Sequence, residues 1–166
     1  MRVRALVLSD THVSSSTSRV LPRAVLEAAA TADVIVHAGD FVGPEVLEAL
    51  SALAPVHAVL GNNDHGLVGR LPATTEFDLG GVSFAVVHDS GPTAGRSNRL
   101  ARMFPTAELV VFGHSHQPWS SPGVNGQWLL NPGSPTQRRR APTHTFAWVE
   151  AGDGRQLCAT VVHVES

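Results

Sequence analysis

Seven side chains that can bind a divalent metal follow short apolar runs along this sequence. They occur in the segments DTH, GD, GNND, a histidine after an apolar run, and GHSH. Imidazole, carboxylate and carboxamide ligands suit Mn, Fe, Zn or Ni, so cysteine is not needed. Seven donors are too many for one ion, but two ions can share them when one carboxylate bridges. The candidate ligands are Asp10, His12, Asp40, Asn62, His88, His114 and His116.

Each of these segments is weak evidence when it stands alone. GD and GNND are also good turn sequences, and a chain with nine histidines can contain an HxH pair by chance. Five such segments in order are much stronger evidence. If the chain stays extended past Gly113, alternate side chains project to one side, so His114 and His116 would lie together. His37 also precedes a GD segment, but on a buried strand we expect it to be a packed, hydrogen-bonded core residue.

The apolar runs in the first half predict buried strands that alternate with helices. Such an order favours parallel strands joined by crossover helices. Ligands bind beyond the carboxyl ends of the strands in such sheets, so the polar loops are expected to converge on one crevice. The expected strands are Val3 to Ser9, Asp33 to His37 and Val56 to Leu60. One helix is expected at Pro22 to Ala30, and a second is indicated by the helical spacing of Val46, Leu47, Leu50 and Leu53.

The second half of the chain is richer in strands. A hairpin around Gly80-Gly81 leads into His88, and a helix from about Ala94 to Phe104 precedes the strand that carries GHSH. No repeat or linker interrupts the chain, which predicts a single domain over residues 1–166. The later strands are expected at Gln127 to Leu130, Thr143 to Glu150 and Gln156 to Val164.

Composition limits the partners and the compartment. The chain is 43% hydrophobic and 16% charged, as in ordinary globular proteins, and its net charge of -2 gives no reason to expect nucleic acid as a partner. The first apolar stretch stops at Asp10, too early for a signal peptide or a membrane span. The single cysteine, Cys158, cannot form an internal disulfide. These features predict a cytoplasmic protein without a membrane partner.

The five segments, in this order, resemble the motifs of the calcineurin-like metallophosphoesterases, and they are most similar to the small single-domain bacterial and archaeal branch. The resemblance extends to the turn Asn131-Pro132-Gly133-Ser134. It implies an α/β fold, a four-layer αββα sandwich of two mixed β-sheets flanked by helices. It also implies two ions about 3.5–4 Å apart, one bound by Asp10, His12, Asp40 and His116, the other by Asp40, Asn62, His88 and His114, with Asp40 bridging.

The resemblance further implies a metal-dependent phosphoesterase, a hydrolase of small-molecule phosphate esters. Phosphodiester hydrolysis by a metal-bridging hydroxide is favoured, with Mn as the favoured metal and Ni, Zn or Fe as alternatives. Two other functions stay open: a phosphomonoester phosphatase with the same site, and a non-catalytic protein-interaction scaffold like the retromer subunit of this fold. Members of this branch often look dimeric, which leaves a homodimer open as well.

The sequence departs from the family where many members have a histidine that protonates the leaving group. This chain has Asn63, whose amide is no general acid but can donate a hydrogen bond to a phosphoryl oxygen. His65 is the nearest replacement, with an exposed turn histidine as the equal alternative. Arg96 and Arg99 are candidates for binding the substrate phosphate, although a solvated face explains them as well. The run Arg138-Arg139-Arg140 could form a basic lip near the site.

Overall fold

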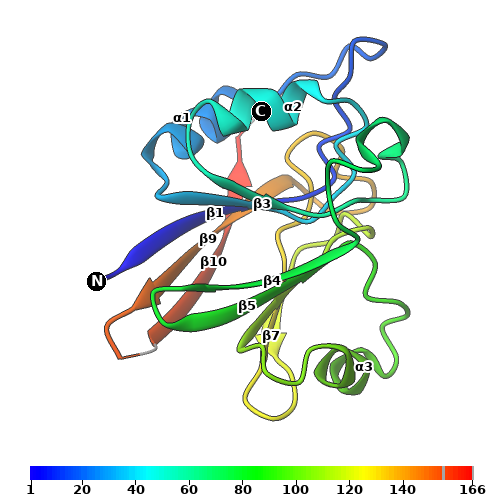
Figure 1. Cartoon of the computed structure of the whole chain (residues 1–166). Coiled ribbons are helices and arrows are strands. Elements are labelled where there is room, and N and C mark those ends of the chain that lie inside the picture. The colour runs from blue at the N-terminus through cyan, green and yellow to red at the C-terminus, as the bar shows by residue number, and fades with distance from the viewer. Residues whose placement is uncertain (155, 166) are drawn as a thin grey trace.

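The computed structural model describes residues 1–154 and 156–165, and this part of the chain forms four layers. Two five-stranded sheets pack face to face (Figure 1). Helices α1 (Arg23–Thr31) and α2 (Glu45–Ser51) cover the outer face of one sheet, and α3 (Arg96–Met103) covers the other. The predicted αββα sandwich of two mixed sheets is confirmed.

The first sheet combines the strands of the amino-terminal half with the last two strands of the chain. Strands β1, β2 and β3 are parallel, whereas β9 runs antiparallel to β1 and β10 antiparallel to β9. Leu8 pairs with His37, and His37 pairs with Ala58, so the three parallel strands end at the same level. The strands in spatial order are β10 (Gln156–Val164), β9 (His144–Gly152), β1 (Val3–Leu8), β2 (Val34–His37) and β3 (Val56–Ala58).

The second sheet has a parallel centre and antiparallel edges. Val86 pairs with Val111, and Val111 pairs with Leu130, so the strands before His88 and before GHSH also end together. One edge strand, WSSP, was not expected from the sequence, because it is short, polar and exposed and therefore lacks an apolar pattern. The strands in spatial order are β4 (Thr74–Leu79), β5 (Val82–Val87), β6 (Leu109–Val111), β8 (Trp128–Asn131) and β7 (Trp119–Pro122).

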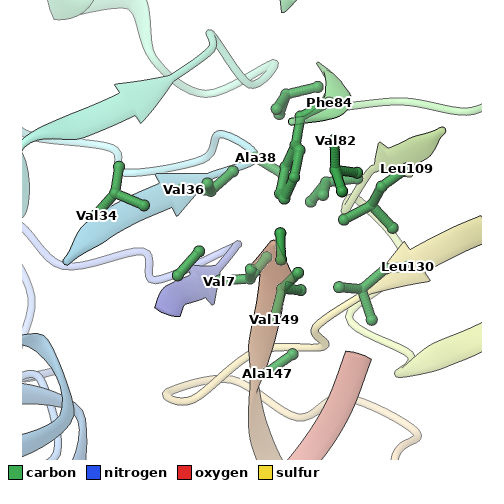
Figure 2. Close-up of a cluster of buried hydrophobic side chains, with 14 of the residues drawn as sticks. Val7, Val34, Val36, Ala38, Val82, Phe84, Leu109, Leu130, Ala147 and Val149 are labelled. Atoms are coloured by element: carbon green, nitrogen blue, oxygen red, sulfur yellow. The ribbon is translucent and has the colours of Figure 1, made fainter. Parts of the chain in front are cut away.

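Alternation along β1 explains why this strand is apolar on both faces. Ala5 and Val7 point into the core between the sheets, where they pack with Val149 and other aliphatic side chains (Figure 2). Leu6 and Leu8 point the opposite way, into the layer beneath α1 and α2. Each side chain is at most 1% exposed. A strand buried on both sides holds its carboxyl end in a fixed position, and the DTH segment starts there.

The helices are short, and two of them begin directly after a proline. Pro22 precedes α1 and Pro44 precedes α2, where the missing N–H and the fixed φ of proline cost nothing. Helix α2 ends at Ser51, and Leu53, which the helical spacing included, lies beyond it with 43% of its surface exposed. Within the described residues, none of the helices has the length and apolarity needed to cross a bilayer. A 3₁₀ turn, η1 (His65–Leu67), follows GNND.

Candidate metal centre

Backbone hydrogen bonds join the loops that leave the strand ends. Asp10 N donates to Gly39 O at 2.9 Å, and His12 N donates to Asp40 O at 3.0 Å. In the other sheet, Gly113 N donates to His88 O at 2.9 Å. These bonds therefore tie the loop after β1 to the loop after β2, and the loop after β5 to the loop after β6.

Asp10 lies at the centre of these loops and is fully buried. Its Oδ2 accepts hydrogen bonds from Ser9 Oγ at 2.7 Å and from the His114 backbone N–H at 3.0 Å. Its Oδ1 faces three imidazoles: the Nε2 atoms of His116 at 3.4 Å, and of His12 and His88 at 3.8 Å each. One oxygen thus fixes the carboxylate, and the other is presented to the histidines.

The carboxylate of Asp40, the second in the cluster, lies between histidines from two loops. Its Oδ2 lies 3.4 Å from His12 Nε2 and 3.5 Å from His88 Nε2. Asn63 steadies this side chain, because its backbone N–H donates to Oδ1 and its amide donates to Oδ2, both at 2.9 Å. This oxygen faces histidines from the DTH loop and from the loop after β5, as Asp10 Oδ1 also does, and a bridging role for Asp40 stays a prediction.

Second hydrogen bonds orient two of the imidazoles. His88 Nδ1 donates to the Ala38 carbonyl at 2.7 Å, and His116 Nδ1 donates to the Gln137 carbonyl. These assignments follow from the carbonyl partners, which can only accept. With the proton on Nδ1, each ring presents the lone pair of Nε2 toward the aspartates, as a metal-binding histidine does.

Asn62 and His114 complete the side of the cluster nearest His88. Asn62 Oδ1 lies 3.0 Å from His88 Nε2 and 3.3 Å from His114 Nδ1. The rings of His88 and His114 are 5.3 Å apart, and those of His12 and His116 are 5.0 Å apart. The two histidines of GHSH therefore have different side-chain neighbours, and their assignment to different ions stays a prediction.

The expectation of an extended backbone through GHSH is wrong. His114 has φ of 72° and His116 has φ of 61°, both in the left-handed region. His116 is fully buried, whereas His114 is exposed. The backbone turns because the His114 N–H donates to Asp10 Oδ2 and the Ser115 N–H donates to the Gly113 carbonyl, and neither bond fits an extended strand.

Left-handed backbone is concentrated in these loops. Non-glycine residues rarely adopt positive φ, and the conformation persists only where the surroundings enforce it. Val42, a β-branched residue that disfavours this region most, has φ of 78°. Five of the seven predicted ligands share the conformation: Asp10, His12, Asp40, His114 and His116.

Asp64 is a positioning residue whose role the sequence did not reveal. The carboxylate is buried, and its Oδ2 accepts the N–H groups of Asp40 at 2.8 Å and of Gly61 at 2.7 Å. Its Oδ1 accepts the N–H of Val42 at 2.7 Å. One side chain thus ties the GD loop to the GNND loop and holds Val42 in its unfavourable conformation. The acidic residue at the end of GNND was visible in the sequence, but its burial and its three partners were not.

The turn after β8 fastens the DTH loop from the other side. Ser134 Oγ donates to the Asp10 carbonyl at 2.7 Å, and Thr136 Oγ1 donates to the Thr11 carbonyl. Asn131 Nδ2 donates to the Gly113 carbonyl at 3.1 Å. This turn was recognised in the sequence only as part of the family resemblance, and the structure gives it a physical role in placing the two loops that carry the predicted ligands of DTH and GHSH.

His37 packs behind the cluster, as expected. The ring is fully buried and stacks on Phe41 with centroids 3.6 Å apart. Its Nδ1 accepts the Gly39 N–H at 3.1 Å, so Nε2 carries the proton and donates to Thr11 Oγ1, also at 3.1 Å. Complete burial lowers the pKa of His37 to about 3, which keeps the ring neutral.

The other predicted site residues occupy different surroundings. Asn63 contacts Asp40, as described above, and His65 is exposed with no side-chain hydrogen bond to any described residue. Arg99 donates to the carbonyls of Ser90, Pro92 and Ala94 and so holds the loop after His88 together. Arg96 donates to Ser90 Oγ at 2.9 Å, and its guanidinium lies 4.8 Å from the centre of the Phe112 ring. Substrate binding by either arginine stays a prediction.

The electrostatics of the cluster favour ionised carboxylates. Burial alone would raise the pKa of Asp10, but the neighbouring imidazoles of His116, His12 and His88 outweigh burial and hold the pKa well below its ordinary value. Burial acts in the same way on Asp40, and contacts with His88 and Asn63 lower its pKa to about 2. For His88, burial would lower the pKa, but Asp40 and Asp10 raise it above its ordinary value. The site therefore attracts positive charge.

The donor set fits divalent metal ions. Asp10 Oδ1, His12 Nε2 and His116 Nε2 are buried side-chain atoms without a hydrogen-bond partner among the described residues. Buried polar groups are normally paired, so three such atoms facing one another indicate a ligand. The donor atoms form two groups, and within each group they lie within 4.8 Å of one another. One group is Asp10, His12 and His116, and the other is Asp10, Asp40 and His88.

Comparisons with known proteins agree with this arrangement. The family model of the calcineurin-like phosphoesterase superfamily domain matches residues 1–154. A probable metallophosphoesterase of Methanothermobacter thermautotrophicus is 33% identical over 158 residues, which cover 94% of this chain and 90% of the relative.

Solved structures share the fold at lower identity. Vps29 of Entamoeba histolytica in complex with Zn²⁺ has a TM-score of 0.72 at 23% identity and covers 96% of this chain and 98% of its own. A Streptococcus pneumoniae protein described as a predicted phosphoesterase has a TM-score of 0.73 at 21% identity, covering 98% and 90%. The family model and the archaeal relative together show that this chain belongs to the calcineurin-like phosphoesterase superfamily.

Proposed function

We propose that this protein is a dinuclear metal-dependent phosphodiesterase of small-molecule substrates. The observation that carries the proposal is the set of buried, unpartnered atoms of Asp10, His12 and His116 beside Asp40 and His88. Asp10, His12, Asp40 and His116 would hold one ion, and Asp40, Asn62, His88 and His114 the other. Imidazole, carboxylate and carboxamide ligands without a thiolate favour Mn, with Ni, Zn or Fe as alternatives.

Two such ions supply Lewis-acid stabilisation of phosphoryl charge and lower the pKa of water at the site. The residues of the chain prepare this chemistry by fixing the ligand atoms before substrate arrives. Asp10 Oδ2 accepts hydrogen bonds from Ser9 and from the His114 backbone. His88 Nδ1 donates to the Ala38 carbonyl, and the Asn63 amide donates to the Asp40 carboxylate. Ligands held in this way need little rearrangement during the reaction, which is how a preorganised site lowers a barrier.

The proposal is tested by measuring hydrolysis after metal reconstitution. We expect the protein loaded with Mn to cleave bis(nitrophenyl) phosphate faster than nitrophenyl phosphate, because the diester brings a good leaving group and the chain has Asn63 in place of a general acid. A chelator should abolish the rate and Mn should restore it. Faster monoester cleavage would favour the phosphatase, and no cleavage of either ester would contradict the enzyme.

Asn63 provides the first mutational prediction. We expect Asn63→His to keep the metal content of the wild type and to raise the rate on an alkyl phosphodiester relative to the nitrophenyl diester by roughly tenfold, because an imidazole can protonate a poor leaving group. Asn98→His, the same change at an exposed position of α3, is the control and should leave this ratio unaltered. An equal effect of Asn63→His on both esters would argue against proton donation.

Metal affinity is expected to fall in acid. The raised pKa of His88 in the metal-free chain means that protons compete for this imidazole at a higher pH than for an ordinary histidine. As the pH falls below that pKa, affinity should drop about tenfold per pH unit for each proton displaced. Metal content after dialysis at pH 8 and pH 5.5 measures the effect, with circular dichroism to show that the fold persists. Equal content at the two pH values would contradict it.

The scaffold alternative has less support. The likeness to Vps29 is at identities that show the fold alone. A protein that serves only as a scaffold has no need to bury unpartnered histidine and carboxylate atoms at one point. A homodimer and a cytoplasmic location stay predictions from the sequence.

A further inference from the structure

A groove with a volume of about 730 Å³ adjoins the metal centre on the side of GHSH. It is lined by Ser115, Gln117, Arg139 and Arg140. Ser115 and Gln117 stand on either side of His116, so the groove begins where this predicted ligand loop meets solvent. The groove therefore shares the GHSH loop with two predicted ligands, His114 and His116.

The arginine-bearing turn is fastened to the same loop. The Gln137 carbonyl accepts the His116 Nδ1–H, and the Gln137 N–H donates to Ser134 Oγ at 2.9 Å. The turn then closes on itself, because the Ala141 N–H donates to the Arg138 carbonyl at 2.9 Å and Arg138 Nη1 donates to the Ala141 carbonyl at 2.9 Å. These bonds place the arginines beside the metal centre on an anchored turn.

Arg139 reaches back to the ligand loop itself. Its Nη1 donates to the His114 carbonyl at 3.2 Å, so the guanidinium lies against the backbone of a predicted ligand. A guanidinium has five N–H groups, and this contact occupies only part of them. The others stay available to a group that enters the groove.

No carboxylate among the described residues lies within 4.0 Å of a guanidinium nitrogen of Arg139 or Arg140. Among the described residues, the arginines within 4.0 Å of a carboxylate are Arg2, Arg23 and Arg70. Two unpaired guanidinium groups on the wall of a groove attract an anion, and their planar N–H pairs match the oxygens of a phosphate. Beside a metal centre that already binds one phosphate, such a wall selects a substrate with two.

We infer that this groove binds a second phosphate group, carried by the same molecule whose phosphodiester is cleaved. Arg139 and Arg140 are then specificity-determining residues, and the preferred substrates are phosphodiesters that bear a further phosphate on one substituent. This inference rests on the proposed phosphodiesterase function and narrows its substrate class.

The test compares two esters that share a leaving group. One is the nitrophenyl ester of thymidine 5′-phosphate, and the other is the same ester with an added phosphate on its 3′ oxygen. We expect the added phosphate to raise kcat/KM of the Mn-loaded wild type about tenfold. Rising salt should reduce this preference, because the arginines are exposed to solvent.

The main variant is R139G/R140A, in which the ratio of kcat/KM for the two esters should fall to about one. Glycine is chosen at position 139 because Arg139 has φ of 50°, which glycine adopts without strain. R2A/R23A removes the same charge from two arginines that pair with Glu150 and Glu27, and its ratio should equal that of the wild type. Metal content is measured in every variant.

A second variant covers the case in which loss of the Arg139 contact lowers the metal content. No described residue shares a side-chain hydrogen bond or ion pair with Arg140, so R140E reverses the charge without breaking a bond of the turn. Its ratio should fall below one while metal content stays at the wild-type level. The inference would be overturned if the ratio of kcat/KM for the two esters in R140E and in R139G/R140A equalled that of the wild type. It would also be overturned if the wild type did not prefer the ester with the added phosphate.

Failure of the proposed function is distinguishable from failure of the groove. If neither ester is hydrolysed, the phosphodiesterase is wrong, and calorimetry tests the groove directly. Thymidine 3′,5′-bisphosphate should then bind the Mn-loaded wild type about tenfold more tightly than thymidine 5′-phosphate, and R139G/R140A should lose the difference. Equal affinities in the wild type would overturn the inference by this route.

Discussion

Asp40→Asn should remove metal and hydrolysis together. The carboxylate oxygen Oδ2 lies within 3.5 Å of His12 and of His88, one from each group of donors, so a neutral amide at this position weakens both proposed ion sites at once. We expect metal content to fall to a small fraction of the wild type and kcat/KM for the diester to fall on the order of a thousandfold. Elemental analysis and the chromogenic assay measure the two effects.

The matched control for this variant is Asp78→Asn. Asp78 is an exposed residue of β4 whose carboxylate accepts a hydrogen bond from Ser83 Oγ, and the same change of charge there should leave metal and rate near the wild-type values. If Asp40→Asn kept full activity and normal metal content, Asp40 would not bridge the ions, and Asp10, which faces histidines of both groups, would be the better candidate.

Asp64→Ala is expected to cause the largest loss of stability. The substitution leaves the buried N–H group of Asp40 and the partly buried N–H groups of Val42 and Gly61 without an acceptor. Each orphaned group costs about 1–3 kcal/mol, and relaxation recovers part of the sum, so the free energy of unfolding should fall by about 3–5 kcal/mol. Thermal unfolding should show a midpoint lower by about 10 °C.

Asp33→Ala serves as the control for Asp64→Ala. Asp33 is exposed and accepts one backbone N–H, that of Arg4, at 2.8 Å, so its loss should cost less than about 1 kcal/mol. Asp64→Ala should also weaken metal binding, because the left-handed backbone of Asp40 loses its support. A midpoint within two degrees of the control, used as a rough threshold, would mean that water replaces the carboxylate and that Asp64 does not hold the loops.

Local pattern predicted most of the fold. The apolar runs before DTH, GD, GNND, His88 and GHSH all became strands. Four of these strands are largely buried on both faces, whereas β3, which precedes GNND, is only partly buried. Strand β7 was missed, since Trp119–Pro122 lies on an exposed edge and is stabilised by pairing with β8 rather than by its own pattern. Sandwich packing itself came from the resemblance, because strand order depends on contacts distant in sequence.

The convergence of the candidate donors was predicted from residue type and order, and their division into two groups came from the family resemblance. The backbone geometry of the loops was predicted by neither. The side chains of His114 and His116 reach different partners through left-handed turns, and those turns depend on Asp10 Oδ2 accepting the His114 N–H across 104 residues of sequence. The role of Asp64 was hidden for the same reason, because backbone N–H groups leave no mark on the sequence. Residue types report chemistry, whereas long-range hydrogen bonds decide its placement.

The central claim is that the converged loops hold two divalent ions. Elemental analysis of the purified chain, reconstituted with Mn and passed through a desalting column, tests it most directly. We predict about two ions per chain in the wild type. One ion per chain would contradict the dinuclear assignment, and none would contradict the metal centre itself.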